Sequence, residues 1–586
     1  MPKSQTLAKL FIIASYILRR RENICRGKMI LVFLQDKKNI MLIYRLQFSD
    51  VFREDKKDLI DYLKNISKST LEKTISFLNK DDLPNYNDFF SNRTIQNDIN
   101  GRVENFVRNK KLQIPICVFS TEANLYIFEG IIANRKQLLD ENTLRRDTDR
   151  DELNIFKSIL WVNEFLNEKE KNMNLPNESN NIYKIAQVFI TLNFSTADLG
   201  LYDDINRELG NLVYASFYKL KELINFLEQG NEKYLNKIYE YFNVRERKDF
   251  LTRVAELYFN VVDKSVGKDC FFKVKDNDQQ KFLDSLIAKE IKIEDDFVNI
   301  RNYPVYKKTD GTYIVLNPFF IMDKFTISLK FFLVKSFWDN NIQGDFSNFY
   351  NKDFSEKFLM KKLFDSIFDY KYFVKKKTLG EEEAKDEPDY YFRYNNKIFI
   401  FEYKDILINK NVKVSRDIEI ILSELKKKLL QNKTGDKGIG QLVKHINNID
   451  NNEFPFDDGI KTNKSLKIYP ILVLSDRKLE ILGINYQFNQ WFRDELGDLS
   501  HENIKVQDLV VMSLDSFIVF KNKFKQDKEN FRKMLDRHIT EMKKENTHAQ
   551  FSEIKNKLLP FSARFINEGL KEEDFKGMFE EYLIKN

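Results

Sequence analysis

The pattern of apolar and polar residues between residues 387 and 405 is that of a β-hairpin. Residues 390–394 and 397–403 each have the composition of a strand, and Asn395-Asn396 stands between them. Asparagine tolerates the positive φ that a two-residue hairpin turn requires. The run Ile-Phe-Ile-Phe at 398–401 is typical of a protein core. We therefore predict a hairpin whose second strand is buried.

Apolar residues spaced three or four positions apart predict helices on both sides of this hairpin and in the middle of the chain. Upstream we expect a helix over 354–368 and a strand over 372–378, and downstream a helix over 438–446 and a strand over 467–476. In the middle of the chain we expect helices over residues 153–169, 209–228, 232–242 and 247–262.

The first 130 residues have a mixed pattern. Strand-like segments at 29–34 and 40–48 precede a helical period over 58–79, and residues 113–120 and 124–130 have the pattern of a second hairpin. A further hairpin turns at Thr309-Asp310-Gly311, an apolar helix follows at 319–337, and a short strand at 509–512 precedes the helical end of the chain.

With 586 residues the chain is long enough for three or four domains. We expect an α/β multidomain protein. Its parts would be an α+β domain at 1–131, a mainly helical domain at 132–340 with a hairpin near 303–316, an α/β core at 341–514 and a helical tail at 515–586.

Three charged residues are placed on the predicted hairpin. Asp389 begins the first strand, and Glu402 and Lys404 end the second. Residues two apart on a strand point to the same face, and a two-residue turn folds Asp389 back beside them. Two carboxylates and one ammonium at the end of so apolar a strand are costly unless a metal or a partner compensates them.

Pro388-Asp389 followed by Glu402-Tyr403-Lys404 resembles the PD-(D/E)XK nuclease superfamily, in the E-x-K form of its motif. The predicted order of helix, three strands, helix and strand is similar to the core of that superfamily, and the upstream helix carries Glu356, where relatives often have a glutamate. The resemblance covers roughly residues 346–496. It implies a restriction-endonuclease-like αβββαβ core.

The resemblance also implies a metal site. Asp389, Glu402 and the main-chain carbonyl of Tyr403 would be ligands of Mg²⁺, for which Mn²⁺ would substitute, because Mg²⁺ prefers hard oxygen ligands. Lys404 would orient the attacking water and stabilise the phosphorane charge, and Glu356 would ligate directly or through water. The alternative is a buried salt bridge of Lys404 with Glu402 or Asp389.

The helix at 438–446 carries a second part of the resemblance. Gln441 matches a glutamine that many relatives have near the site, where it would contact a phosphate or position water; the alternative is a solvated helix residue. His445 lies one turn on, on the same face. Many relatives have tyrosine there, so His445 departs from the pattern.

Lysines surround this helix and the glycine-rich segment at 433–440. They would grip a phosphate backbone without reading sequence, or they are solvent-facing lysines in a lysine-rich protein. No G-x-x-x-x-G-K-[ST] motif occurs, so we expect no nucleotide hydrolysis. The lysines in question are Lys426, Lys427, Lys428, Lys433, Lys437 and Lys444.

Composition and charge restrict the protein class. The hydrophobic fraction is 42% and the charged fraction 32%, as in soluble globular proteins, and the net charge of +7 allows nucleic-acid binding only through a local basic surface. The three cysteines and four histidines are scattered, which excludes a disulfide framework and a zinc cluster and fits a reducing cytoplasm. The apolar segment 7–18 is too short to span a bilayer, so we expect no membrane partner.

Two functions remain from different classes. The first is a Mg²⁺-dependent endonuclease acting on nucleic acid, DNA more than RNA, with a restriction-type or anti-phage role by analogy alone. The helical domain would then bind a substrate, an activator or a protein partner. The second is an inactive nuclease-fold module that binds nucleic acid or assembles with other proteins. The intact Asp389, Glu402 and Lys404 favour the first.

Overall fold

The computed structural model contains two compact units. Among the described residues, the sheet unit comprises those within 174–198 and 343–575, and the helical unit comprises those within 29–173, 199–342 and 576–583. The apolar segment 7–18 lies outside the described residues. The structure describes residues 29–32, 41–64, 66–78, 85–134, 138, 148–171, 173, 181–197, 199, 205–262, 271–272, 274, 276–287, 293–339, 345–377, 387–433, 435–544 and 551–583.

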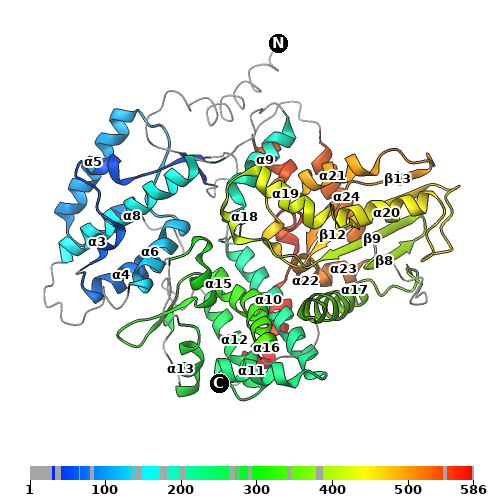
Figure 1. The fold of residues 1–586 in the computed structure, drawn as a ribbon, viewed down its shortest axis with the longest axis horizontal. Helices are drawn as coiled ribbons and strands as arrows, with labels where there is room; N and C mark the ends of the chain where they lie inside the picture. Colours follow the sequence, from blue (N-terminus) through cyan, green and yellow to red (C-terminus); the bar gives the residue numbers. More distant parts are fainter. Residues whose placement is uncertain are drawn as a thin grey trace, which may run out of the picture. The chain divides into compact units, whose positions relative to one another are not determined.

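A mixed β-sheet forms the centre of the sheet unit (Figure 1). Its strands lie in the order β13-β12-β9-β8-β7, and β14 also pairs with β12. Strands β7, β8 and β9 form an antiparallel meander, whereas β12 is parallel to β9, and β13 and β14 are parallel to β12. The bounds are β7 Val374–Lys375, β8 Tyr390–Tyr394, β9 Lys397–Lys404, β12 Leu466–Leu474, β13 Ile504–Val506 and β14 Val510–Ser513.

The predicted hairpin is confirmed as β8 and β9. Asn395 in its turn adopts a φ of 53°, the left-handed conformation that asparagine tolerates better than most residues. Strand β9 is buried over most of its length. Its two edges pair with β8 and β12, and its side chains are buried on both faces of the sheet, which explains its continuous apolar run.

The two faces of β9 have different chemistry. Ile398 and Ile400 belong to an aliphatic core that includes residues of α19, α20 and α21. Phe399 and Phe401 point to the other face, where Phe399 stacks on Tyr469 with ring centroids 4.7 Å apart. Since side chains alternate along a strand, the even-numbered Glu402 and Lys404 share the aliphatic face with α20.

Helices cover both faces of the sheet, with α20 and α17 on opposite sides of it in Figure 1. The predicted helix at 354–368 is confirmed as a π-helical segment, η5, that continues into α17. The predicted helical end of the chain is confirmed as well. The helices of this unit include α9 Ile182–Asn193, η5 Asn348–Met360, α17 Lys361–Ile367, α18 Lys410–Val414, α19 Ile418–Leu429, α20 Gly438–Asp450, α21 Ile484–Leu496, α22 Leu514–Val519, α23 Lys521–Gln526, α24 Asn530–Lys543, α25 Phe551–Leu558 and α26 Phe561–Arg564.

The helical unit confirms the four helices predicted in the middle of the chain and the hairpin around Gly311. The predicted apolar helix at 319–337 is α15, a π-helical segment η4 and α16 in succession. The elements of the helical unit include α5 Arg93–Lys110, α8 Thr148–Lys171, α10 Ile205–Glu228, α11 Glu232–Phe242, α12 Arg247–Val262, α13 Asn277–Asp284, α14 Val298–Asn302, β5 Val305–Lys307, β6 Tyr313–Val315, α15 Pro318–Asp323, η4 Lys324–Ser328, α16 Leu329–Asp339 and the greater part of α27 Glu572–Leu583.

The second hairpin predicted at 113–130 is wrong. Only β3 (Ile116–Cys117) is a strand there, and it pairs in parallel with β2 (Met41–Arg45). Residues after it form the helix α6 (Thr121–Ala133), which Ser120 caps by accepting a hydrogen bond from the Ala123 N–H at 3.2 Å. Helix α6 is buried on almost every side, so its sequence lacks the one-sided period of a surface helix.

Two other N-terminal predictions are wrong in their bounds. The strand predicted at 40–48 ends at Arg45, and the helix α2 (Phe48–Val51) follows. The single helix predicted at 58–79 is two helices, α3 (Leu59–Leu63) and α4 (Lys68–Leu78). The predicted strand at 29–34 is β1 (Met29–Val32), which is antiparallel to β2.

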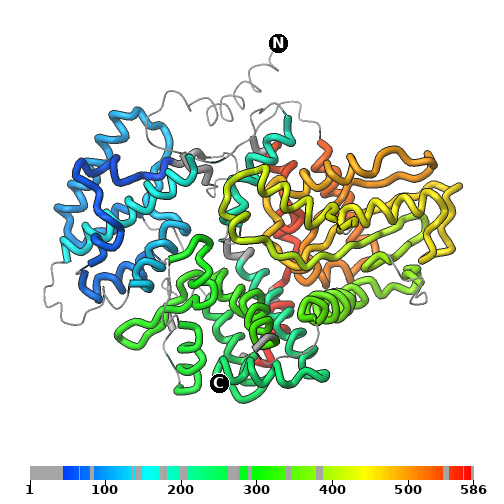
Figure 2. Tube along the Cα trace, in the orientation of Figure 1, coloured from blue at the N-terminus to red at the C-terminus, as the bar shows by residue number. Residues whose placement is uncertain are grey.

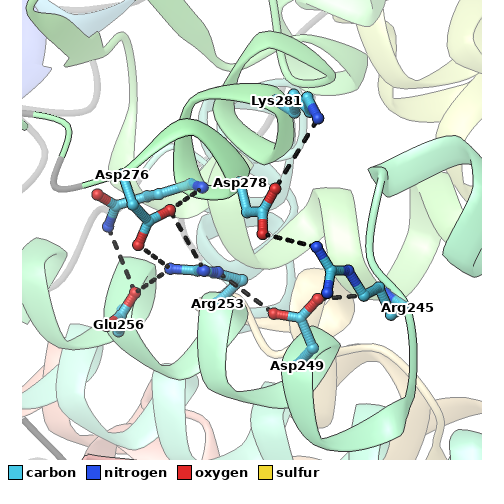
Figure 3. Close-up of polar contacts among 8 residues, drawn as sticks. Arg245, Asp249, Arg253, Glu256, Asp276, Asp278 and Lys281 are labelled. Atoms are coloured by element: carbon cyan, nitrogen blue, oxygen red, sulfur yellow. Dashed lines mark hydrogen bonds and ion pairs between the residues drawn. The ribbon is translucent and has the colours of Figure 1, made fainter.

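A polar network holds α13 against α12 within the helical unit (Figure 3). Arg253 contacts three carboxylates, with its guanidinium 3.3 Å from Asp276, 3.4 Å from Asp249 and 3.6 Å from Glu256. Arg245 extends the network to Asp278 at 3.4 Å. One arginine shared among three acids neutralises charge that would otherwise repel, so we assign this cluster to the packing of the two helices.

None of the helices described in the structure is both long enough and apolar enough to cross a membrane.

Candidate active site

The register of the hairpin brings Asp389 and Glu402 together. Tyr390 pairs with Phe401, so one step beyond the regular ladder Asp389 lies opposite Glu402. Lys404 is two residues further along β9 and therefore on the same face. Its Nζ lies 2.9 Å from Glu402 Oε2 and 3.3 Å from Asp389 Oδ2. The structure thus places the three charged residues predicted from the sequence in one cluster.

Pro388 ends the ladder next to this cluster. The register places Pro388 opposite Tyr403, and proline has no N–H to donate across the strands. The Pro388 carbonyl accepts a hydrogen bond from Lys376 Nζ at 2.6 Å, and the Tyr403 N–H donates to Asp389 Oδ2 at 2.7 Å. The proline therefore leaves the Tyr403 carbonyl without a cross-strand donor, and the side chain of Asp389 accepts from the Tyr403 N–H.

The main-chain carbonyl of Tyr403 faces the same side. The Ser475 N–H donates to the carbonyl of Lys404 at 3.1 Å, so the Lys404 carbonyl points toward β12. Backbone groups alternate in direction along a strand, and the Tyr403 carbonyl must therefore point toward the Asp389 side. No N–H of Pro388 is available to it. This carbonyl is the one that the sequence predicted as a third metal ligand.

Neighbouring groups separate the protonation behaviour of the two carboxylates. Glu402 is fully buried, whereas the side chains of Asp389 and Lys404 are 15% and 18% exposed. Burial raises the pKa of Glu402, but the Lys404 charge and the hydrogen bond from His445 outweigh it and lower the pKa to about 2. Burial raises the pKa of Asp389 well above its usual value, and the charge of Glu402 raises it further.

Lys404 is held as an ammonium. Burial lowers its pKa, but the adjacent charges of Glu402 and Asp389 raise it more, so the net shift is upward. A lysine in this state is a fixed positive charge between the two carboxylates and does not act as a base.

Glu356 approaches the cluster from η5. Ser355 beside it shares a 2.5 Å hydrogen bond with the Tyr403 hydroxyl, which joins η5 to β9. Burial raises the pKa of Glu356, while its largest interactions with charged groups are with Lys404 and Glu402. The structure therefore places Glu356 within the electrostatic reach of the cluster.

Helix α20 covers the cluster along one of its faces. Gly438 at its start lies so close to β9 that a Cβ there would be 3.4 Å from Lys404 Cγ. Two turns on, His445 Nε2 lies 3.0 Å from Glu402 Oε1. Gln441 is half-buried between them on the same face. The sequence placed Gln441 and His445 on one face but gave no signal that His445 contacts Glu402.

The donor set fits a hard divalent cation. Three carboxyl groups, from Glu356, Asp389 and Glu402, surround the single ammonium of Lys404, and burial raises the pKa of Glu356 and Asp389, so their ionised forms carry a cost that a cation would relieve. Among the described residues, no group of three or more His, Cys, Asp or Glu side chains is arranged to hold a metal ion. Mg²⁺ commonly binds through one or two carboxylates with water completing its shell, so Asp389, Glu402 and the Tyr403 carbonyl suffice for it.

The predicted lysine cluster is distributed over several elements. Lys426 on α19 lies over the ring of Trp491, 5.4 Å from its centroid, and Lys428 pairs with Glu424 at 3.3 Å. Lys427 and Lys433 are exposed. Lys437, at the N-terminus of α20, and Lys444 on the same helix are half-buried. Lys426 and Lys428 thus have packing or ion-pair partners of their own.

In comparisons with protein-family models, with curated proteins and with solved structures, no match to this chain was found.

Proposed function

We propose that this chain is a metal-dependent endonuclease that hydrolyses phosphodiester bonds of nucleic acid, DNA in preference to RNA. One observation carries the proposal: Lys404 Nζ contacts Asp389 and Glu402 at once, at the end of two adjacent strands. This is the cluster that the resemblance to the PD-(D/E)XK motif implies, and the hairpin predicted from the sequence pattern brings it together.

The order of the elements supports the proposal. A helix (η5 with α17) precedes the three strands β7, β8 and β9, and the helix α20 and the parallel strand β12 follow. Apart from α18, α19 and the short strands β10 (Gln431–Asn432) and β11 (Gly435–Asp436), which lie between β9 and α20, this order is similar to the αβββαβ order of the superfamily that the motif resembles. The support is an analogy of fold, and the charged cluster gives it chemical content.

The residues divide the chemistry among them. Asp389, Glu402 and the Tyr403 carbonyl would hold a Mg²⁺ ion, which when bound supplies Lewis acidity toward the phosphate and a more acidic water. Lys404 remains charged and can orient a water and stabilise negative charge that develops on the phosphate. Glu356 adds a carboxylate on the η5 side, and Gln441 adds a neutral amide on the α20 side.

The experiment is incubation of the purified full chain with plasmid DNA and with RNA, in Mg²⁺, in Mn²⁺ and in EDTA. We expect cleavage of DNA with either metal and none in EDTA. Asp389→Ala, Glu402→Ala and Lys404→Ala should each lower the rate by about 100-fold or more, as does the removal of a single group that stabilises transition-state charge.

Circular dichroism must show that these variants remain folded. Undiminished cleavage by folded Asp389→Ala would refute the assignment. Binding of nucleic acid without cleavage under every metal condition would instead favour the inactive binding module.

The biological role follows only by analogy with large multidomain nucleases. A restriction-type or anti-phage effector is the role we propose. The helical unit has the size of a domain that recognises a substrate, an activator or a protein partner.

A further inference from the structure

Glu402 is held by a second group besides Lys404. His445 Nε2 lies 3.0 Å from Glu402 Oε1, on the oxygen that Lys404 does not contact. An ionised carboxylate only accepts hydrogen bonds, so Nε2 carries the proton of this contact. Glu402 therefore has one oxygen bound to the imidazole and the other directed toward Lys404.

His445 is unusual as a core residue. Its side chain is 2% exposed, and Phe454 packs edge-on against its ring with centroids 6.3 Å apart. Its Nδ1 is buried without a hydrogen-bond partner in the part of the chain that the structure describes. A buried polar atom without a partner costs stability, and an apolar side chain would avoid that cost. The hydrogen bond from Nε2 to Glu402 offsets the cost of the unpartnered Nδ1.

We infer that His445 is a positioning residue for Glu402, and that it restricts Glu402 to a single oxygen, Oε2, for binding a divalent cation. The inference rests on the proposed function. Oε1 is engaged by the imidazole, and Oε2 lies on the Lys404 side, where Asp389 also points. A fully buried carboxylate fixed in this way cannot turn to bind the cation through both oxygens.

The test is a titration of the full chain with Mn²⁺ alone, in which the electron paramagnetic resonance signal of the free ion gives the dissociation constant. Removing a hydrogen-bond partner of a metal ligand typically weakens metal binding by about 10- to 100-fold. We expect that decrease in His445→Phe, which keeps a ring of similar size but donates no hydrogen bond. His445→Gln places an amide N–H near the position of Nε2, and it should restore most of the affinity.

His501 offers a matched control at the other end of α20. Its Nδ1 lies 3.0 Å from Asp450 Oδ1, the same kind of contact to a carboxylate outside the cluster. His501→Phe should leave the Mn²⁺ affinity unchanged. Thermal unfolding in EDTA should show that His445→Phe remains folded, with a melting temperature somewhat below that of the parent chain, because the buried Glu402 Oε1 loses its donor.

The outcomes distinguish this inference from the proposed function. If the parent chain binds Mn²⁺ and cleaves, and His445→Phe binds Mn²⁺ equally well, the positioning role is overturned and the nuclease stands. An equal decrease of affinity in His445→Phe and His445→Gln also overturns it, because the hydrogen bond would then not be the cause. A parent chain that binds no Mn²⁺ overturns the metal-dependent function itself.

Discussion

Asp389 and Glu402 face each other across one strand pair, yet their environments shift their pKa values in opposite directions. Glu402 receives hydrogen bonds from Lys404 and from His445, and its pKa falls to about 2. Asp389 is buried beside that negative charge, and its pKa is raised. The folded protein therefore favours the ionised form of Glu402 and disfavours that of Asp389. Ionising Asp389 in the folded protein therefore costs free energy, and we interpret this as a cost that a bound cation would relieve.

Asp389→Asn should raise the melting temperature in EDTA at pH 7. Because the folded pKa of Asp389 is above its ordinary value of 3.8, its ionisation costs stability from pH 3.8 upward and costs nothing below it. The difference between variant and parent should therefore vanish below about pH 3.8. Each kcal/mol removed corresponds to a rise of about 2–4 °C in a unit of this size.

Glu402→Gln should show the opposite sign in the same series of melts. The folded pKa of Glu402 lies below its ordinary value of 4.5, so its ionisation stabilises the fold above pH 4.5 and this contribution disappears as the pH falls toward 2. The variant should melt below the parent at pH 7 and approach it in acid. If both variants shift the melting temperature in the same direction at pH 7, the assignment of opposite environments is wrong.

The sequence predicted the cluster but not its environment. The alternation of side chains on a strand and the two-residue turn suffice to place Asp389, Glu402 and Lys404 on one face. The contact of His445 with Glu402 depends on how α20 packs on β9, and no local pattern encodes that position. That Pro388 leaves the Tyr403 carbonyl without a cross-strand donor also depends on the register, which the hairpin turn sets.

At the scale of elements, Gly438 controls how closely α20 approaches the sheet. Its φ is +27°, and a Cβ there would lie 3.0 Å from Leu472 Cδ1 and 3.2 Å from the Leu429 carbonyl oxygen. Gly438→Ala should therefore destabilise the protein by about 1–3 kcal/mol, the usual cost of overpacking. It should also lower cleavage, because Lys404 Cγ is the third neighbour.

Gly101→Ala is the control for this substitution. Gly101 lies inside α5, and nothing approaches within 4 Å of a Cβ placed there. Alanine in an open helical position stabilises by roughly 0.5–1 kcal/mol. Urea unfolding measures both variants. An unchanged midpoint in Gly438→Ala would show that α20 can move away from β9 without cost.

The lysines around α19 and α20 allow a test of the surface proposed to bind nucleic acid. Lys427 and Lys433 are exposed, so changing both to Glu leaves the packing of α19 intact. We expect weaker binding to all DNA sequences alike. The salt dependence should become shallower by about 0.9 in log–log slope for each phosphate that the variant no longer neutralises. Filter binding at several salt concentrations measures it.

Lys426→Glu serves as the comparison in the same assay. Lys426 lies over Trp491, so its replacement should affect stability more than the salt slope. If the slope of the Lys427 and Lys433 double variant equals that of the parent chain, these lysines form a solvated face and not a binding surface.

The largest error at this scale has a physical cause. The second hairpin predicted at 113–130 was misjudged because burial on almost every side of α6 removes the one-sided period of a surface helix. Helices with one wet face, such as α12, keep a pattern that sequence alone reveals. Tertiary packing decides the remainder.

At the scale of the whole molecule, α9 belongs to the sheet unit although residues 199–342 separate it in sequence from the rest of that unit (Figures 1 and 2). Ile190 and Phe194 belong to the same apolar core as β9 and α20. Gln187 Nε2 donates to Gln487 on α21 at 2.9 Å. Gly483 allows a close approach, since a Cβ there would lie 2.7 Å from the Ala186 carbonyl oxygen.

A chain beginning at Gly344 keeps Glu356, the hairpin and α20, and on sequence grounds it keeps every residue that the chemistry needs. The structure shows that it would lack α9 and expose the core that Ile190 and Phe194 cover. Burying one such side chain is worth about 1.5–3 kcal/mol. We therefore expect this shortened chain to melt well below the full chain and to cleave poorly for that reason alone.

A synthetic peptide of residues 174–198 separates lowered stability from impaired chemistry. Added in excess to the shortened chain, it should raise the melting temperature, because a ligand that binds only the folded state stabilises it in proportion to the logarithm of its concentration over its dissociation constant. Cleavage should recover with it, while choice of target, assigned to the helical unit, should not. The same peptide with Ile190→Asp should do neither, since it places a charge in the apolar core. Full stability of the shortened chain without any peptide would show that α9 is dispensable, and full stability without cleavage would show that the helical unit completes the active site.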